Sequence, residues 1–155
     1  MKRLELTEDL MTGIKEIDNQ HRELLALGNE VLFPDSGETT DRDILKVLNF
    51  LIKYVKIHFD AEELLMECNG FDRLEGHRKQ HRRLRREVEG LADRAKQQGT
   101  VKGLANELYY LLHDWYIYHI REWDKAMAVY TSKTFQTFKK TVPEPEDIEF
   151  NDFEI

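Results

Sequence analysis

Apolar residues recur at intervals of three and four along four stretches of the chain, which is the periodicity of an amphipathic α-helix. The predicted helices cover residues 18–33, 41–68, 74–98 and 102–130. Turn-forming residues follow the first three of them, at Pro34, Gly37, Asn69, Gly70 and Gly99. Asp41 is the expected N-cap of the second helix. Long helices joined by short connections favour antiparallel neighbours.

This pattern predicts an all-α protein built as an up-down-up-down antiparallel four-helix bundle. An N-terminal arm precedes the bundle and an acidic C-terminal extension follows it. We expect residues 1–131 to form one domain and residues 132–155 to form the extension. The chain has only eight Gly and three Pro, and long stretches contain neither, which argues against a β-sandwich with many tight turns.

The net charge of −7 is unevenly distributed along the chain. Six acidic residues and no Lys or Arg lie in residues 143–155, so the remaining chain carries about −1. A nearly neutral bundle has no general attraction for nucleic acid or anionic membranes. The basic run at 77–86 is expected to be a solvated outer helix face. Without a secretory leader or a long apolar stretch, the protein is expected to be cytoplasmic.

Candidate chemistry lies on the apolar stripes of the predicted helices. Five of the six histidines stand there, at His21, His58, His77, His81 and His119. His58 with Glu62, and His77 with His81, are four residues apart and therefore share a helix face. Burying so many imidazoles without partners would be costly, whereas a bound metal would satisfy them together. The sequence therefore predicts a metal site inside the bundle.

The ligand types leave the metal open among iron, zinc, copper and manganese. Cys68 is the only cysteine, which excludes a cysteine-based site and an intrachain disulfide. Cys68 itself is expected to be a small packed residue. Five histidines and a carboxylate exceed the four ligands of a tetrahedral zinc site. Two metals bridged by carboxylates are therefore expected.

The motifs that carry these ligands resemble the hemerythrin family, in particular its bacterial branch. They are the runs at 13–14, 17–21, 58–63 and 77–81, Met66, Trp115, the pair at 119–120 and Asp124. The resemblance covers about residues 6–127. The sequence departs from the bacterial pattern at Leu6, where a Trp is usual, and in the acidic tail.

The resemblance implies a pair of iron ions joined by an oxo or hydroxo bridge. One ion would be held by His77, His81 and His119. The other would be held by His21 and His58, which leave a position open on it. The two carboxylates, Glu62 and Asp124, would bridge both ions. Helix spacing alone favours Glu122 over Asp124, because five residues rotate a regular helix by about 140°. Asp124 therefore requires a local distortion, or metals that lie between the two directions.

The resemblance also implies reversible binding of dioxygen as a hydroperoxide at the open iron, for transport, storage or delivery, and no enzymatic activity. Its partners would be dioxygen and an oxygenase or redox protein. Two alternatives stay open: an oxygen or iron sensor that acts through a partner, and a diiron enzyme that acts on peroxide or nitric oxide. The sequence leaves the oligomeric state undecided.

The surroundings of the open iron would distinguish these functions. An oxygen carrier needs a dry apolar pocket, for which Leu24, Phe59 and Ile117 are the candidates. An enzyme needs a proton donor, for which Tyr116 and Tyr118 are the nearby candidates. The dry-pocket hypothesis gives neither tyrosine a role. His113 lies off the stripe and is expected to be an ordinary, partly exposed histidine.

Overall fold

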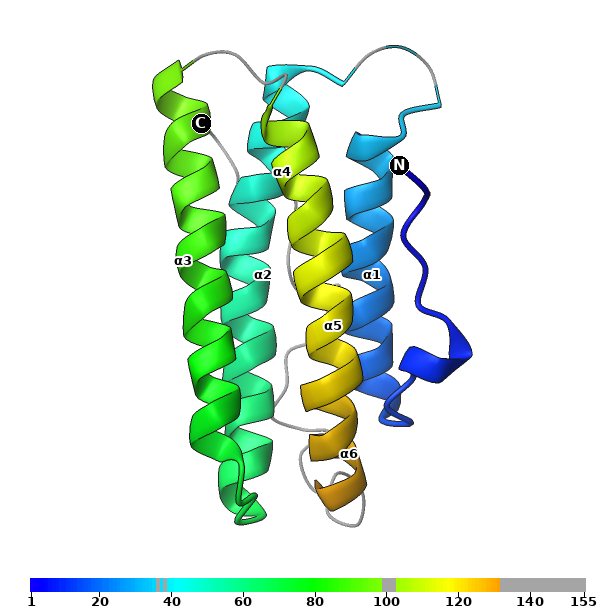
Figure 1. The fold of residues 1–155 in the computed structure, drawn as a ribbon, viewed down its shortest axis with the longest axis vertical. Helices are drawn as coiled ribbons and strands as arrows, with labels where there is room; N and C mark the ends of the chain where they lie inside the picture. Colours follow the sequence, from blue (N-terminus) through cyan, green and yellow to red (C-terminus); the bar gives the residue numbers. More distant parts are fainter. Residues whose placement is uncertain (36, 38, 99–102, 132–155) are drawn as a thin grey trace.

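The described helices form four long columns. The columns stand side by side, and consecutive columns run in opposite directions (Figure 1). The computed structural model describes residues 1–35, 37, 39–98 and 103–131. The first three columns are single helices: α1 (Lys15–Leu32), α2 (Asp41–Cys68) and α3 (Leu74–Gln98). Within the described ranges there is no β-strand. The predicted all-α antiparallel bundle is confirmed, while the expected extension at 132–155 lies outside the described residues.

The fourth column alternates between α-helical and π-helical turns. Its segments are α4 (Leu104–Tyr110), the π-helix η2 (Leu111–Tyr116), α5 (Ile117–His119), the π-helix η3 (Ile120–Asp124) and α6 (Lys125–Thr131). In a π-helical turn the backbone hydrogen bond joins residues five apart instead of four. The sequence pattern predicted one regular helix here, so both π-helical segments depart from that expectation.

Thr40 begins α2. The Thr40 hydroxyl accepts a hydrogen bond from the Asp43 N–H (3.3 Å), and the Asp43 carboxylate accepts one from the Thr40 N–H (3.1 Å). This reciprocal capping box satisfies two backbone donors that the first helical turn leaves free. The expected N-cap, Asp41, is instead the first helical residue. Just after the other end of α2, Gly70 has φ +65°, a left-handed conformation that glycine adopts readily. This agrees with the predicted end of the helix at residue 68.

The segment before α1 is folded around the buried carboxylate of Asp18. This carboxylate accepts hydrogen bonds from the backbone N–H groups of Thr12 (2.7 Å) and Gly13 (3.0 Å). Gly13 has φ +80°, which a residue with a side chain would rarely adopt. These contacts start α1 at Lys15, three residues before the expected start at residue 18.

The N-terminal arm lies beside α1 (Figure 1) and includes the short 3₁₀-helix η1 (Glu8–Leu10). Leu4 and Leu10 are buried in the main core, and Leu6 is partly buried against it. Asn29 of α1 holds the arm at two points: its side-chain oxygen accepts from the Leu4 N–H, and its side-chain nitrogen donates to the Leu4 carbonyl, both at 2.7 Å. The arm is thus part of the packed bundle.

The apolar interior is divided into two clusters. The larger one contains residues such as Leu24, Leu48 and Leu108, and the smaller one contains Met66 and Met127. Each fully buried side chain of this size stabilises the fold by about 1.5–3 kcal/mol. A layer of histidines and carboxylates lies between the two clusters along every column. None of the described helices has the length and apolar character needed to cross a bilayer.

Candidate metal centre

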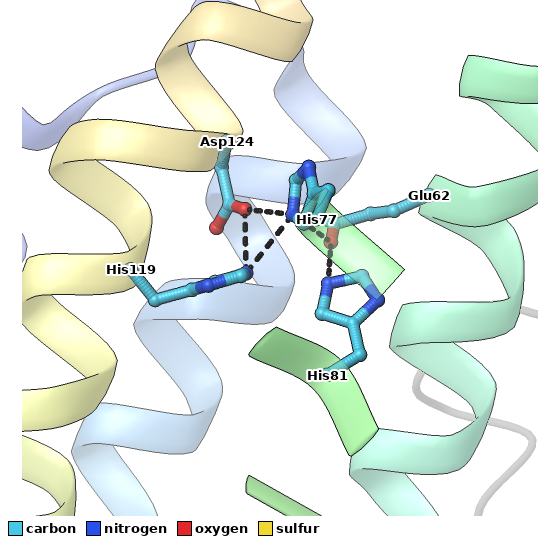
Figure 2. A group of neighbouring side chains, drawn as sticks. All are labelled: Glu62, His77, His81, His119 and Asp124. Carbon is cyan, nitrogen blue, oxygen red and sulfur yellow. Dashed lines mark hydrogen bonds and ion pairs between the residues drawn. The ribbon is translucent and has the colours of Figure 1, made fainter. Parts of the chain in front are cut away.

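All seven predicted ligand residues meet in this layer. They come from every column of the bundle, and each is at most 1% exposed: His21 (α1), His58 and Glu62 (α2), His77 and His81 (α3), His119 (α5) and Asp124 (η3). Figure 2 shows five of them with their side chains directed toward one another. The antiparallel topology therefore brings together residues that lie up to 103 positions apart in the sequence.

The seven residues form two overlapping groups. In each group, one donor atom per residue lies within 4.8 Å of the others. The first group holds His77, His81 and His119, and the second holds His21 and His58. Both carboxylates, of Glu62 and Asp124, belong to both groups.

In the three-histidine group the shortest contacts involve Asp124. Its Oδ1 lies 3.0 Å from Nε2 of His77 and 2.9 Å from Nε2 of His119. Glu62 Oε2 lies 3.2 Å from Nε2 of His81. These donor atoms converge on one point from three columns (Figure 2).

The two-histidine group receives the other oxygen of each carboxylate. Asp124 Oδ2 lies 3.2 Å from Nε2 of His21, and Glu62 Oε1 lies 3.4 Å from Nε2 of His58. Each carboxylate therefore directs one oxygen to each group. A carboxylate that bridges two metals requires this orientation.

The donor atoms of the cluster have the burial and spacing expected of metal ligands. Both oxygens of Glu62 and of Asp124, and Nε2 of His21, His58 and His81, are buried without a hydrogen-bond partner. Nε2 of His77 and Nε2 of His119 also approach each other to 3.0 Å. Ligand atoms about 2.1 Å from one first-row metal, at right angles, lie about 3 Å apart. The cluster therefore fits metal ions.

The π-helical turn explains how Asp124 reaches the centre. Asp124 is the last residue of η3 and follows His119 by five positions, the spacing that a π-helical turn places one above the other. Glu122, which a regular helix would favour, is exposed to solvent. The local distortion that Asp124 required is thus present. The five-residue spacing between His119 and Asp124 was the available sequence signal for it, because a regular helix would turn these two residues about 140° apart.

Two polar side chains form hydrogen bonds with Nδ1 of ligand histidines, whose Nε2 faces the centre. The sequence pattern gave neither side chain a role. Gln20 Oε1 accepts a hydrogen bond from Nδ1 of His58 at 2.7 Å, and Glu63 Oε1 accepts one from Nδ1 of His81 at 2.8 Å. A proton on Nδ1 leaves the Nε2 lone pair directed at the centre. Both residues stand next to a ligand in the sequence, but adjacency alone does not indicate a contact between different helices.

Burial controls the charge of the centre. It lowers the pKa of His58, His81 and His119 below the ordinary value, so these imidazoles stay neutral, which is the form that binds metal. Burial, with the nearby Asp124, raises the pKa of Glu62 well above its ordinary value.

Aromatic rings cover the three-histidine group. Phe59 stacks on His81 with ring centroids 3.8 Å apart, and Trp115 stacks on His119 at 4.8 Å. Trp123 lies 5.7 Å from His77, and a Cβ at Gly76 would approach its indole to 2.9 Å. Glycine at that position therefore lets the indole lie close to helix α3.

The predicted pocket residues are placed unequally. Leu24 and Phe59 are fully buried, whereas Ile117 is only half-buried at the edge of the core. Tyr118 is 55% exposed. Tyr116, by contrast, is fully buried with its ring 5.7 Å from that of His21.

Sequence reasoning missed a second tyrosine. Tyr54 is buried and stacks on His58, with ring centroids 5.9 Å apart. Its position four residues before His58 was the available signal. Burial raises the pKa of both Tyr54 and Tyr116 well above the ordinary value, which keeps both phenols protonated. The surroundings of His21 and His58 therefore include two protonated phenols as well as apolar side chains.

The remaining candidates lie outside the cluster. His113 is exposed and contacts Asp114, as expected for a histidine off the stripe. The basic run at 77–86 places most of its cations toward solvent, which agrees with a solvated helix face. Cys68 is exposed, so the expectation that it is packed was wrong. It ends α2 beyond the last turn that the core covers.

Four antiparallel helical columns around a buried layer of histidines and carboxylates define a metal-binding helical bundle. Residues 12–130 match the hemerythrin HHE cation binding domain. The chain therefore belongs to the hemerythrin family, as the motif resemblance predicted.

Several bacteriohemerythrins are similar to this chain. That of Pseudomonas aeruginosa is 35% identical over 124 residues, which cover 80% of this chain and 78% of the relative. That of Methylococcus capsulatus is 30% identical over 116 residues, covering 74% and 85%. That of Stenotrophomonas maltophilia is 28% identical over 121 residues, covering 78% and 76%. No solved structure gave a significant match.

Proposed function

We propose that this protein binds dioxygen reversibly at two iron ions, for transport, storage or delivery of oxygen. One observation carries the proposal: two donor groups share both carboxylates but differ by one imidazole. The group with fewer imidazoles leaves room for an outside ligand. When bound, a pair of ferrous ions supplies the electrons that dioxygen takes up and gives back on release. The similarity to proteins named bacteriohemerythrin supports this choice.

The residues of this chain would divide the work as follows. His77, His81 and His119 would hold one ion, and His21 and His58 the other. Glu62 and Asp124 would each give one oxygen to each ion, which follows from the orientation of their oxygens.

The burial and orientation of the ligands support reversible binding. Every ligand residue is at most 1% exposed, so bulk water and protons reach the centre only through packed side chains. Gln20 and Glu63 keep His58 and His81 oriented, which reduces the rearrangement that each binding and release event requires. Phe59 and Trp115 cover the rings of His81 and His119 on the three-histidine side.

The visible spectrum of iron-loaded protein tests the proposal. Reduced protein should gain an absorption band in air and lose it under argon over repeated cycles, with about two irons per chain. His77→Ala should lose iron and the band. The matched variant His113→Ala, at an exposed histidine on the fourth column, should keep both. A single metal per chain, or a band that argon does not reverse, would refute the proposal.

A further inference from the structure

Tyr54 and Tyr116 place two hydroxyl groups in the interior of the bundle, and neither hydroxyl has a hydrogen-bond partner. Tyr54 is 2% exposed and Tyr116 is fully buried. Folded proteins pair nearly all buried polar atoms. Phenylalanine would fill almost the same space without burying a hydroxyl. Two such groups at one place therefore indicate a hydrogen-bond acceptor that is bound there.

Both tyrosines stand at the two-histidine side of the centre. The Tyr54 ring stacks on His58, and the edge of Tyr116 meets His21 at an interplanar angle of 87°. Burial raises the pKa of both phenols, with a further contribution from Tyr54 to that of Tyr116 and from Glu62 to both. The donors thus gather where the ligand set lacks one imidazole.

The three-histidine side has a different character. Its rings are covered by Phe59, Trp115 and Trp123, which offer flat aromatic faces to the imidazoles. The two phenol rings therefore lie at one side of a centre whose other side is covered by apolar aromatic rings.

We infer that Tyr54 and Tyr116 are specificity-determining residues that donate hydrogen bonds to a small anionic ligand bound beside His21 and His58. This inference rests on the proposed function, because the ligand is held at that side by the metal. Protonated phenols repel no anion and offer donors that a purely apolar wall lacks. They would favour ligands that carry negative charge, including dioxygen once it has drawn electron density, over neutral ligands of equal size.

The test is azide binding to the oxidised, iron-loaded protein, followed by titration of the visible spectrum. A hydrogen bond to a charged partner contributes about 10-fold or more to affinity. Tyr54→Phe and Tyr116→Phe should therefore each weaken azide binding by about 10-fold, and the double variant by more. Tyr118→Phe is the matched control, because this exposed tyrosine lies on the same column as Tyr116. It should leave azide affinity unchanged.

A second readout separates recognition from structural support. In the metal-free protein both hydroxyls are unsatisfied, so the two Phe variants should unfold in urea at the same or a higher concentration than the parent chain. An azide affinity that stays within twofold in the double variant would overturn the inference, as would a metal-free double variant of reduced stability. Failure of the argon cycle with normal tyrosine effects would refute only oxygen carriage and leave the inference standing.

Discussion

Gln20→Leu should weaken metal binding at the His58 side while the bundle still folds. The Gln20 side chain is buried, and its Oε1 accepts a hydrogen bond from the His58 Nδ1 at 2.7 Å. Leu has a similar volume but no acceptor, so the ring loses both its orientation and the partner that fixes its proton on Nδ1. Substitutions at such supporting residues reduce metal affinity by about 10- to 100-fold, which corresponds to about 1.4–2.7 kcal/mol.

The same change has a cost in the metal-free protein. An unpaired Nδ1–H in a fully buried ring destabilises the fold by about 1–3 kcal/mol, which lowers the melting temperature by a few degrees. Iron affinity would be measured by competition with a chelator, and stability by urea unfolding of the stripped protein. We expect the chelator to remove one iron from Gln20→Leu well before the second, because His81 keeps its own acceptor, Glu63.

Two variants control for substitution itself. Gln20→Glu keeps an acceptor at the same position and should retain most of the iron affinity. Gln97→Leu makes the same exchange at an exposed site of α3 and should change neither iron affinity nor stability. Parent-like chelator resistance in Gln20→Leu would refute the reasoning, because the hydrogen bond would then contribute nothing to holding the ligand.

Three further results are expected. Asp124→Ala should abolish the visible band and release iron, whereas Glu122→Ala, at an exposed position, should keep both. The reverse outcome in iron analysis would show that the π-helical turn does not direct Asp124 to the metal. Leu24→Ala, at a fully buried site one turn from a ligand, should cost about 2–5 kcal/mol in urea unfolding and speed autoxidation in air; unchanged unfolding would contradict its place in the core. Burial lowers the pKa of three ligand histidines, so below about pH 6.5 the unfolded chain binds more protons than the folded chain. The metal-free protein should therefore lose stability on acidification from pH 7 to 5, by up to about 1.4 kcal/mol per pH unit for each histidine. The raised pKa of Glu62 opposes this loss, but it involves one proton against three. Unfolding that required more urea at pH 5 than at pH 7 would refute the expectation that the buried histidines stay neutral.

The helices and the identity of the buried layer follow from the sequence by itself. Apolar periodicity located the four helical columns, with α2 and α3 at their observed ends. Histidine on an apolar stripe was informative because an unpaired buried imidazole is costly, so several of them on successive helices require a common partner. These are local properties, since each depends on residues within one helix.

Contacts between columns were decided only by the tertiary structure. The pairing of Gln20 with His58, the stacking of Phe59 on His81, and the burial of Tyr116 against His21 each depend on how two columns are rotated and staggered. Sequence spacing specifies a helix face, but it does not specify which residue of the next helix that face meets.

Asp124 illustrates the same limit within one helix. Its five-residue spacing from His119 suits a π-helical turn and not a regular α-helix, and the sequence left Glu122 as the better-placed residue. The two backbone forms differ by a shift of one hydrogen-bond acceptor, a small change that the packing of the whole bundle can impose. The helical columns and their buried ligands were therefore determined locally, whereas the position of each donor atom depended on the assembled fold.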